Sequence, residues 1–205
     1  MAFSSVSSML DACKQSGHPL YEVILESDLA ESGLTRAESE AEMHRLWGVM
    51  CATSAGYCGA DRSMSGYAGG DAAKVAQAAG EGRLYADGYF AEVIAEALKT
   101  AECNACMKRI VAAPTAGSCG VLPAVLLPLF RAGRADEDAV CRALYVAAGF
   151  GQVVAARATL AGAEGGCQAE VGAASAMAAA ALTVLKNGTP EQAAEAFAMA
   201  LTNLE

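Results

Sequence analysis

The sequence predicts an all-α protein: a compact multi-helix domain with a central apolar, alanine-rich helix and with glycine-rich loops at helix N-termini. Hydrophobic residues make up 54% of the 205 residues and aromatic residues only 6%, so the core must consist mainly of Ala, Val, Leu and Met. Such a composition favours closely packed helices. Helix-start signals recur along the chain, and no pair of alternating apolar segments joined by a hairpin turn is found. We therefore expect a single helical domain over residues 1–205.

The first helical segments are separated by a break near residue 33. Residues 1–32 are expected to form a helical lead-in, because Gly33 and Thr35 mark a fresh start. Thr35 and Glu38 form a capping box, in which each side chain accepts a hydrogen bond from the main-chain N–H of the other residue. A helix is therefore expected from about residue 35 onward.

Three further helix signals follow along the chain. Residues 89–99 carry apolar side chains on one helical face, and the acidic residues 136–138 stand where a helix N-terminus favours negative charge. Thr189 and Gln192 form a second capping box, with a proline between them in the first turn. The best strand candidate, residues 109–112, is short and has no partner strand.

The central helix is expected at residues 170–186. This segment is apolar on nearly all sides, which is typical of a buried helix. Its apolar stretch is interrupted by Gly172, Ser175 and Thr183, and we expect it to be too short to span a membrane. Its many small residues allow close approach of neighbouring helices and favour a homodimer.

The net charge and the cysteines indicate which binding partners and which cellular compartment to expect. The formal net charge of −9 and the absence of any Lys/Arg-rich run remove the electrostatic basis for binding nucleic acid or an anionic membrane. A small molecule or a protein is the expected partner. No basic segment followed by an apolar one opens the sequence, so we expect no secretory signal. The eight cysteines are therefore expected to stay reduced in the cytoplasm.

Cys167 is the candidate metal ligand. It follows two glycines and precedes the long apolar helix, so it is expected at a helix N-terminus, where free N–H groups and the helix dipole stabilise a thiolate. Gln168 and Glu170 add polar groups that a purely structural helix start does not require. The alternative is that Cys167 is a small buried packing residue, which is the usual role of a free cysteine.

A glycine-rich segment at residues 114–120 is the candidate substrate-binding loop. Its two glycines permit tight turns with the backbone near a ligand. Free N–H groups and two hydroxyls are expected to converge on a carboxylate, which suits an amino-acid substrate. The expected binding residues in this loop are Thr115, Ala116, Gly117, Ser118 and Gly120. An ordinary helix N-terminus is the alternative, and Cys119 is either a ligand or a packing residue.

Two other groups of candidate residues have little support. Cys103 and Cys106 form a C-x-x-C pair, but a four-cysteine zinc site needs a second such pair, which the sequence lacks. His18 and His44 lie on expected helices without a Ser or Cys partner, so we do not expect them to be catalytic.

Three segments together resemble one enzyme family. RIVAAPTAGSCGVLPA at residues 109–124 and AEGGCQAEVG at residues 163–172 resemble the two signature segments of the α chain, or α domain, of bacterial iron-sulfur L-serine dehydratases. SGYAGGD at residues 65–71 is similar to a third, Gly-Gly-Asp segment of that family. The similarity runs over nearly the whole chain.

The resemblance implies an L-serine ammonia-lyase, which converts L-serine to pyruvate and ammonia without pyridoxal phosphate. The family uses a [4Fe-4S] cluster held by three cysteines, whose open iron acts as a Lewis acid on the substrate. Cys167 matches the first cluster ligand, and the loop at residues 115–120, with Ser65 and Gly66, matches the substrate pocket. A β subunit or β domain supplies further pocket residues.

The family places the other two cluster cysteines beyond the position of residue 205. We therefore expect the 205 residues alone to be a C-terminally truncated α domain that binds no cluster and is inactive. No residue is identified as the base that removes the α-proton. Two other functions stay open: an L-cysteine desulfidase, which uses the same α domain, and a non-catalytic helical assembly module.

Overall fold

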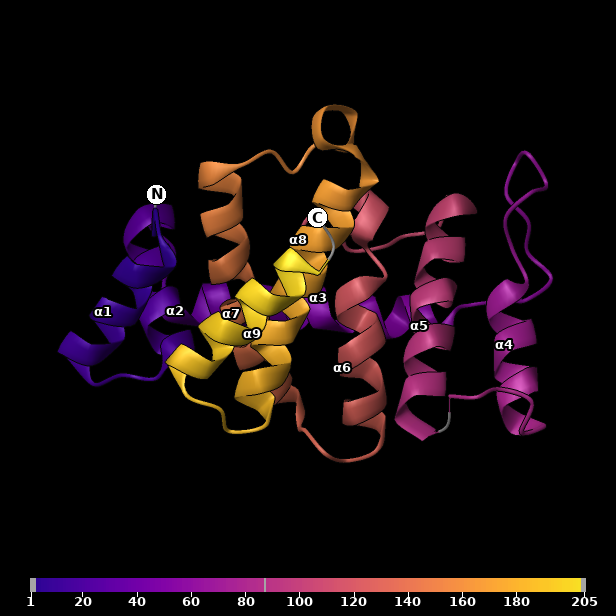
Figure 1. The fold of residues 1–205 in the computed structure, drawn as a ribbon, viewed down its shortest axis with the longest axis horizontal. Coiled ribbons are helices and arrows are strands. Elements are labelled where there is room, and N and C mark those ends of the chain that lie inside the picture. Colours follow the sequence, from indigo (N-terminus) through magenta and orange to yellow (C-terminus); the bar gives the residue numbers. More distant parts are fainter. Residues whose placement is uncertain (1–2, 87, 204–205) are drawn as a thin grey trace. The chain divides into compact units, whose positions relative to one another are not determined.

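The computed structural model describes residues 3–86 and 88–203, and within those residues every regular element is a helix (Figure 1). The all-α fold is therefore confirmed. The helices of the described residues are α1 (Val6–Ser16), α2 (Leu20–Ser32), α3 (Arg36–Ala55), α4 (Asp71–Gly80), α5 (Gly88–Ala105), the 3-10 helix η1 (Ala116–Ser118), α6 (Val121–Arg131), α7 (Glu137–Arg157), α8 (Gly162–Leu185) and α9 (Pro190–Thr202).

The described chain folds into two compact units. Unit 1 comprises residues 3–45 and 135–203, and unit 2 comprises residues 46–134. The boundary falls inside α3, so this helix contributes its first part to unit 1 and its last part to unit 2. Compactness does not establish independent folding, so a single domain over residues 1–205 stays a prediction.

The core of unit 1 lies among α1, α2, α7, α8 and α9, with α8 packed against both α7 and α9 (Figure 1). Ala176 and Ala180 of α8 are fully buried, and their small side chains let the neighbouring helices approach closely. Phe150 of α7 and Phe197 of α9 pack with ring centroids 4.8 Å apart. Helices α1 and α2, which cover most of the expected lead-in, add buried apolar side chains to the same core.

The three helix starts with capping signals are confirmed. The main-chain N–H of Thr35 donates to Glu38 at 2.9 Å, and that of Glu38 donates to the Thr35 hydroxyl at 3.3 Å. Thr189 and Gln192 exchange equivalent bonds of 2.9 and 3.2 Å at the start of α9. The Asp136 carboxylate accepts a 2.8 Å bond from an N–H in the first turn of α7. These local patterns define where the helices begin.

The long apolar helix differs from its expected extent. Helix α8 begins at Gly162, before the expected start at residue 170, and Gly166 interrupts it with φ 72° and ψ 174°. Among the described residues, α7 and α8 are both long and apolar enough to cross a bilayer by length and composition. The expected segment at residues 170–186 is shorter than the helix that passes this test, so the expectation that its apolar stretch is too short to span stays a prediction. Core helices pass the same test, and 67% of the apolar window of α7 is buried within the protein.

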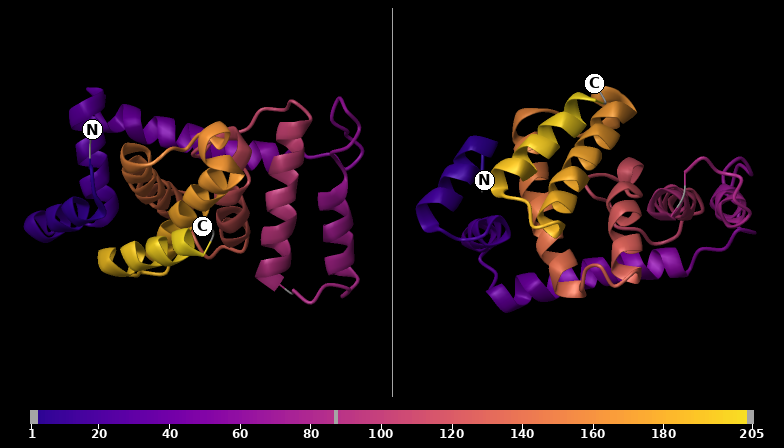
Figure 2. Two further views of the ribbon diagram at one scale, coloured as in Figure 1. Left: turned by 45° about the horizontal axis from the view of Figure 1, so that its top comes forward. Right: turned by 60° about the horizontal axis from the view of Figure 1, so that its bottom comes forward.

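Helix α5 is the scaffold of unit 2. Helices α4 and α5 lie side by side (Figure 2), and α5 also packs against α6. Trp47 of α3 is 1% exposed and meets Phe130 of α6 edge to face, with ring centroids 5.5 Å apart. A Cβ atom on Gly120 would lie 2.7 Å from the carbonyl oxygen of Ala97, so glycine is required where the chain before α6 meets α5.

Candidate functional site

Cys167 lies in unit 1, immediately after the break in α8. Gly166 leaves helical geometry and Cys167 begins the helical segment that follows. The Cys167 thiol is exposed, so it is not one of the packing cysteines. A Cβ atom on Gly162 would lie 2.6 Å from a carboxylate oxygen of Glu170, which places that carboxylate beside the first turn of α8. The structure thus puts Cys167 at a helical N-terminus within reach of a ligand.

The donor set in the described residues does not complete a cluster site. Across residues 3–86 and 88–203, no three His, Cys, Asp or Glu side chains are arranged to hold a metal ion. Cys58 is the other exposed cysteine, and it belongs to unit 2. The exposed Cys167 thiol is therefore not accompanied, among the described residues, by the two further ligands that a three-cysteine cluster site requires.

The loop before α6, residues 114–120, lies in unit 2, and its side-chain hydrogen bonds are made mostly within the loop. The hydroxyls of Thr115 and Ser118 lie 3.2 Å apart, and the Thr115 N–H donates to the Ser118 oxygen at 3.4 Å. Ser118 is 2% exposed. Ala116 and Gly117 are the exposed residues of this loop. The Thr115 and Ser118 hydroxyls thus stabilise the turn, and the loop presents its backbone at residues 116–117.

Cys119 is a packing residue. Its side chain is 2% exposed, and its thiol lies 4.0 Å from the carbonyl oxygen of Thr100. Burial raises the pKa of Cys119 to about 11, so the thiol stays protonated near neutral pH. A protonated thiol is a poor metal ligand.

Ser65 and Gly66 lie at the exposed tip of the loop before α4, also in unit 2. The Ser63 N–H donates to the Ala68 carbonyl at 2.9 Å, and the Gly66 N–H donates to the Ser63 carbonyl at 2.8 Å. The Ser65 hydroxyl lies 3.1 Å from that of Ser63. The tip is therefore a closed turn whose Ser65 hydroxyl contacts that of Ser63.

Glu102 of α5 is a buried carboxylate that the sequence analysis did not single out. Its carboxylate accepts hydrogen bonds from the N–H groups of Gly70 (2.8 Å), Asp71 (2.7 Å) and Ala72 (3.0 Å) and from the Tyr57 hydroxyl (2.6 Å). Burial alone would raise the pKa of Glu102, but these four bonds together lower it. The carboxylate is therefore ionised and caps the N-terminus of α4.

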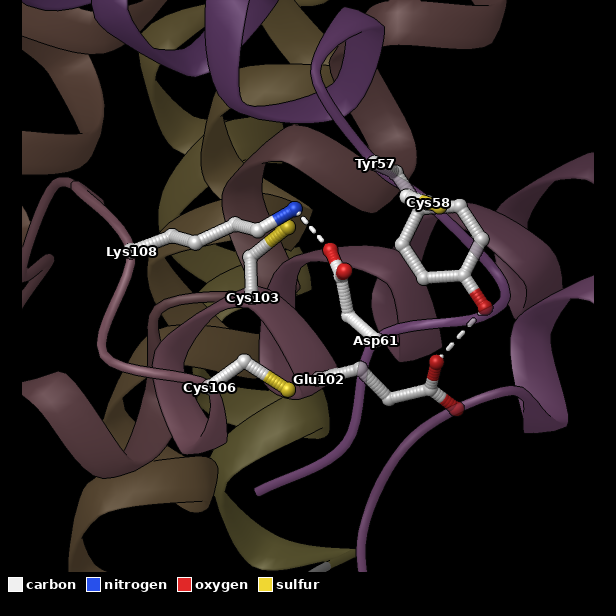
Figure 3. A pocket seen from close by; sticks show the side chains of 7 residues that line it. All are labelled: Tyr57, Cys58, Asp61, Glu102, Cys103, Cys106 and Lys108. Carbon is white, nitrogen blue, oxygen red and sulfur yellow. Dashed lines mark hydrogen bonds and ion pairs between the residues drawn. The ribbon is translucent and has the colours of Figure 1, made fainter. Parts of the chain in front are cut away.

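Glu102 is one of the residues that line a narrow pocket (Figure 3). Asp61 and Lys108 form an ion pair across it. The Cys103 thiol is buried and lies 3.7 Å from the Thr53 carbonyl oxygen, and burial raises its pKa. The C-x-x-C pair thus holds one protonated, enclosed thiol. The lining residues are Tyr57, Cys58, Asp61, Glu102, Cys103, Cys106 and Lys108.

Comparison with known proteins identifies the family. The serine dehydratase alpha chain family model matches residues 15–205. The L-serine dehydratase alpha chain of Peptoniphilus asaccharolyticus is 36% identical over 202 residues, which cover 98% of this chain and 69% of the relative. A probable L-serine dehydratase alpha chain of Bacillus subtilis (strain 168) is 36% identical over 203 residues, which cover 98% of this chain and 67% of the relative. A probable L-serine dehydratase alpha chain of Latilactobacillus sakei is 52% identical over 113 residues, which cover 55% of this chain and 54% of the relative. The resemblance of the three segments is confirmed, and the chain belongs to the serine dehydratase alpha chain family.

Proposed function

We propose that the chain is the cluster-bearing α part of an L-serine dehydratase, a lyase that converts L-serine to pyruvate and ammonia. The observation that carries this proposal is the match of residues 15–205 to the family model, together with relatives of that name covering 98% of the chain. Because those relatives are named alpha chains, a β chain or β domain is the proposed partner. A cytoplasmic location and a homodimer are further proposals.

Cys167 is the proposed cluster ligand of this chain. Its exposed thiol at the start of a helical segment is placed where N–H groups and the helix dipole favour the thiolate. A [4Fe-4S] cluster held by three cysteines supplies a Lewis-acidic iron. Since the described residues fit only one ligand position, two further thiolates must come from outside them, and residues 1–205 alone are proposed to be inactive.

The substrate contacts are proposed at the two exposed loop tips of unit 2. Ala116 and Gly117 present backbone groups, and Ser65 and Gly66 present a hydroxyl and a turn. Thr115, Ser118 and Gly120 support the first of these loops through the bonds and the close packing described above. The base that removes the α-proton is assigned to no residue of this chain, and the β part is its proposed source.

The complete enzyme, with the full-length α chain and its β partner, tests the function. After anaerobic reconstitution, we expect release of pyruvate from L-serine. Cys167→Ala should abolish the visible absorption of the cluster and the turnover. Cys58→Ala removes the other exposed thiol and should leave both unchanged.

Three results would contradict this proposal. Turnover retained by the Cys167→Ala enzyme would remove the ligand assignment. Faster sulfide release from L-cysteine than pyruvate release from L-serine would identify a desulfidase. Binding of the β partner without turnover of either amino acid would indicate a helical assembly module.

A further inference from the structure

The N–H groups at the start of helix α4 already donate hydrogen bonds to a side chain of the protein. The first N–H groups of a helix have no partner within it and, with the helix dipole, form a natural anion site. In unit 2 the Glu102 carboxylate takes up the N–H groups of Gly70, Asp71 and Ala72 at 2.7–3.0 Å, and Glu102 is only 7% exposed. The carboxylate of an amino acid therefore cannot bind at this N-terminus unless Glu102 is displaced.

The same carboxylate bonds to the last residue of the loop that leads into α4. Gly69 and Gly70 have φ values of 127° and 88°, a region that other residues rarely adopt. A Cβ atom on Gly69 would lie 2.2 Å from the carbonyl oxygen of Asp61, so the chain runs directly against its own backbone. Glu102 holds the end of this constrained segment through Gly70, and the exposed tip at Ser65 and Gly66 lies a few residues before it.

Tyr57 also donates a hydrogen bond to the Glu102 carboxylate (Figure 3). Its hydroxyl donates to Glu102 at 2.6 Å and accepts a bond from the Ala73 N–H at 3.3 Å. Burial and the bond to Glu102 raise the pKa of Tyr57 to about 12, so the hydroxyl stays a donor at neutral pH. Tyr57 follows α3, and the pair thus joins the end of α3 to α4 and α5.

We infer that Glu102, held by Tyr57, is a positioning residue of the serine site. It sets the position of the loop tip at Ser65 and Gly66, and its occupation of the α4 N-terminus requires the substrate carboxylate to bind elsewhere. This inference rests on the proposed function, because it assumes that the loop tip contacts L-serine. A purely structural cap is the competing role, in which Glu102 stabilises α4 and does not affect the site.

Two substitutions in the complete reconstituted enzyme separate these roles. In Glu102→Gln the amide keeps one acceptor oxygen and places a donor against the N–H groups, so the loop should lose its anchor. We expect the KM for L-serine to rise about tenfold, with kcat within about twofold of the wild-type value. Tyr57→Phe keeps the three main-chain bonds and should raise KM by about twofold to threefold. A purely structural loss would lower the folded fraction, and hence kcat, without changing KM.

Glu81→Gln is the matched control, because it makes the same chemical change to an exposed carboxylate at the C-terminal end of α4. It should leave KM and kcat unchanged. Amide hydrogen exchange provides a readout that does not depend on activity. The N–H groups of residues 70–72 should exchange faster in the Glu102→Gln protein than in the wild-type and Glu81→Gln proteins.

The outcomes distinguish this inference from the proposed function. A wild-type enzyme that turns over L-serine, with a Glu102→Gln variant of unchanged KM, would overturn the inference alone. Unchanged exchange at residues 70–72 would also overturn it. Absence of L-serine turnover by the wild-type enzyme would overturn the proposed function, and the inference with it.

Discussion

Glu96 is a second buried carboxylate of unit 2. It is bonded mainly by charged side chains, whereas Glu102 is bonded mainly by main-chain N–H groups. Its side chain is 3% exposed and bonds to Lys99 and Arg131, each at 2.6 Å, and to the Ser54 hydroxyl. Arg131 also donates to Ser54 at 2.7 Å. Burial alone would raise the pKa of Glu96, but these bonds lower it. The carboxylate therefore joins α3, α5 and α6 as an ionised group.

Because the pKa of Glu96 is lowered, its contribution to stability decreases as the pH falls. The folded state binds the proton less readily than the unfolded state, so the stabilisation is fully present above the unfolded pKa of about 4.3 and is lost as the pH falls through the folded value. Glu96→Gln should lower the free energy of unfolding at pH 7 by about 2 kcal/mol. The difference from wild type should shrink below pH 4, as measured by urea denaturation.

Glu92→Gln provides the control for this measurement. Glu92 lies one turn earlier on α5 and is exposed, so its replacement should change the free energy of unfolding by less than about 0.5 kcal/mol. A Glu96→Gln protein as stable as the control at pH 7 would show that the buried ionic network contributes nothing net.

At the scale of the helices, we expect replacement by alanine to have opposite effects on stability at two helical glycines. A Cβ atom on Gly149 of α7 would lie 2.5 Å from Cδ1 of Ile24 on α2, in the buried core of unit 1. A Cβ atom on Gly48 of α3 would have no neighbour within 4 Å. Gly149→Ala should therefore destabilise the protein by about 1–3 kcal/mol through overpacking. Gly48→Ala should stabilise it by about 0.5–1 kcal/mol, because alanine has the higher helix propensity.

Thermal and urea denaturation of the two variants measure this difference directly, and each serves as the control for the other. Equal shifts of the same sign would show that helix propensity alone governs both positions. In that case the close contact between α2 and α7 would not limit the size of the residue at position 149.

The sequence predicted those elements whose signals are local. The capping boxes at Thr35 and Thr189 and the N-cap at Asp136 involve residues within three positions of one another, so a single segment contains the whole pattern. Helix α8 starts earlier than the sequence predicts, because Gly162 and Gly165 lower the helix propensity of its first turns. Gly166, the second of the two glycines before Cys167, is the residue at which this helix is interrupted.

The parts of the site that could not be predicted depend on interactions between distant segments. Glu102 bonds to N–H groups about 30 residues earlier in the chain, and on a helix of mixed polarity it looks like any exposed carboxylate. The only available signal was the glycine pair before α4, which leaves N–H groups in need of an acceptor. The burial of Ser118 likewise depends on packing against other segments, although its bonds to Thr115 are local.

At the scale of the whole molecule, the proposed cluster ligand and the loops proposed to contact the substrate belong to different units. Cys167 lies in unit 1, whereas both exposed loop tips and Glu102 lie in unit 2. The chain spans about two thirds of the length of two relatives named alpha chains. From composition and charge we predict a small molecule or a protein as the partner, and only the structure shows which unit contains each candidate residue.

The last prediction concerns the cluster and the 205-residue chain by itself. Cys167 has an exposed thiol, but no group of three possible ligands is found across residues 3–86 and 88–203. A [4Fe-4S] cluster held by three cysteines would therefore lack ligands within these residues. After anaerobic treatment with iron and sulfide and desalting, the chain should retain no more iron and acid-labile sulfide than its Cys167→Ala variant. A stable visible absorption that Cys167→Ala removes would contradict this prediction, because it would mean that ligands within these 205 residues complete the site.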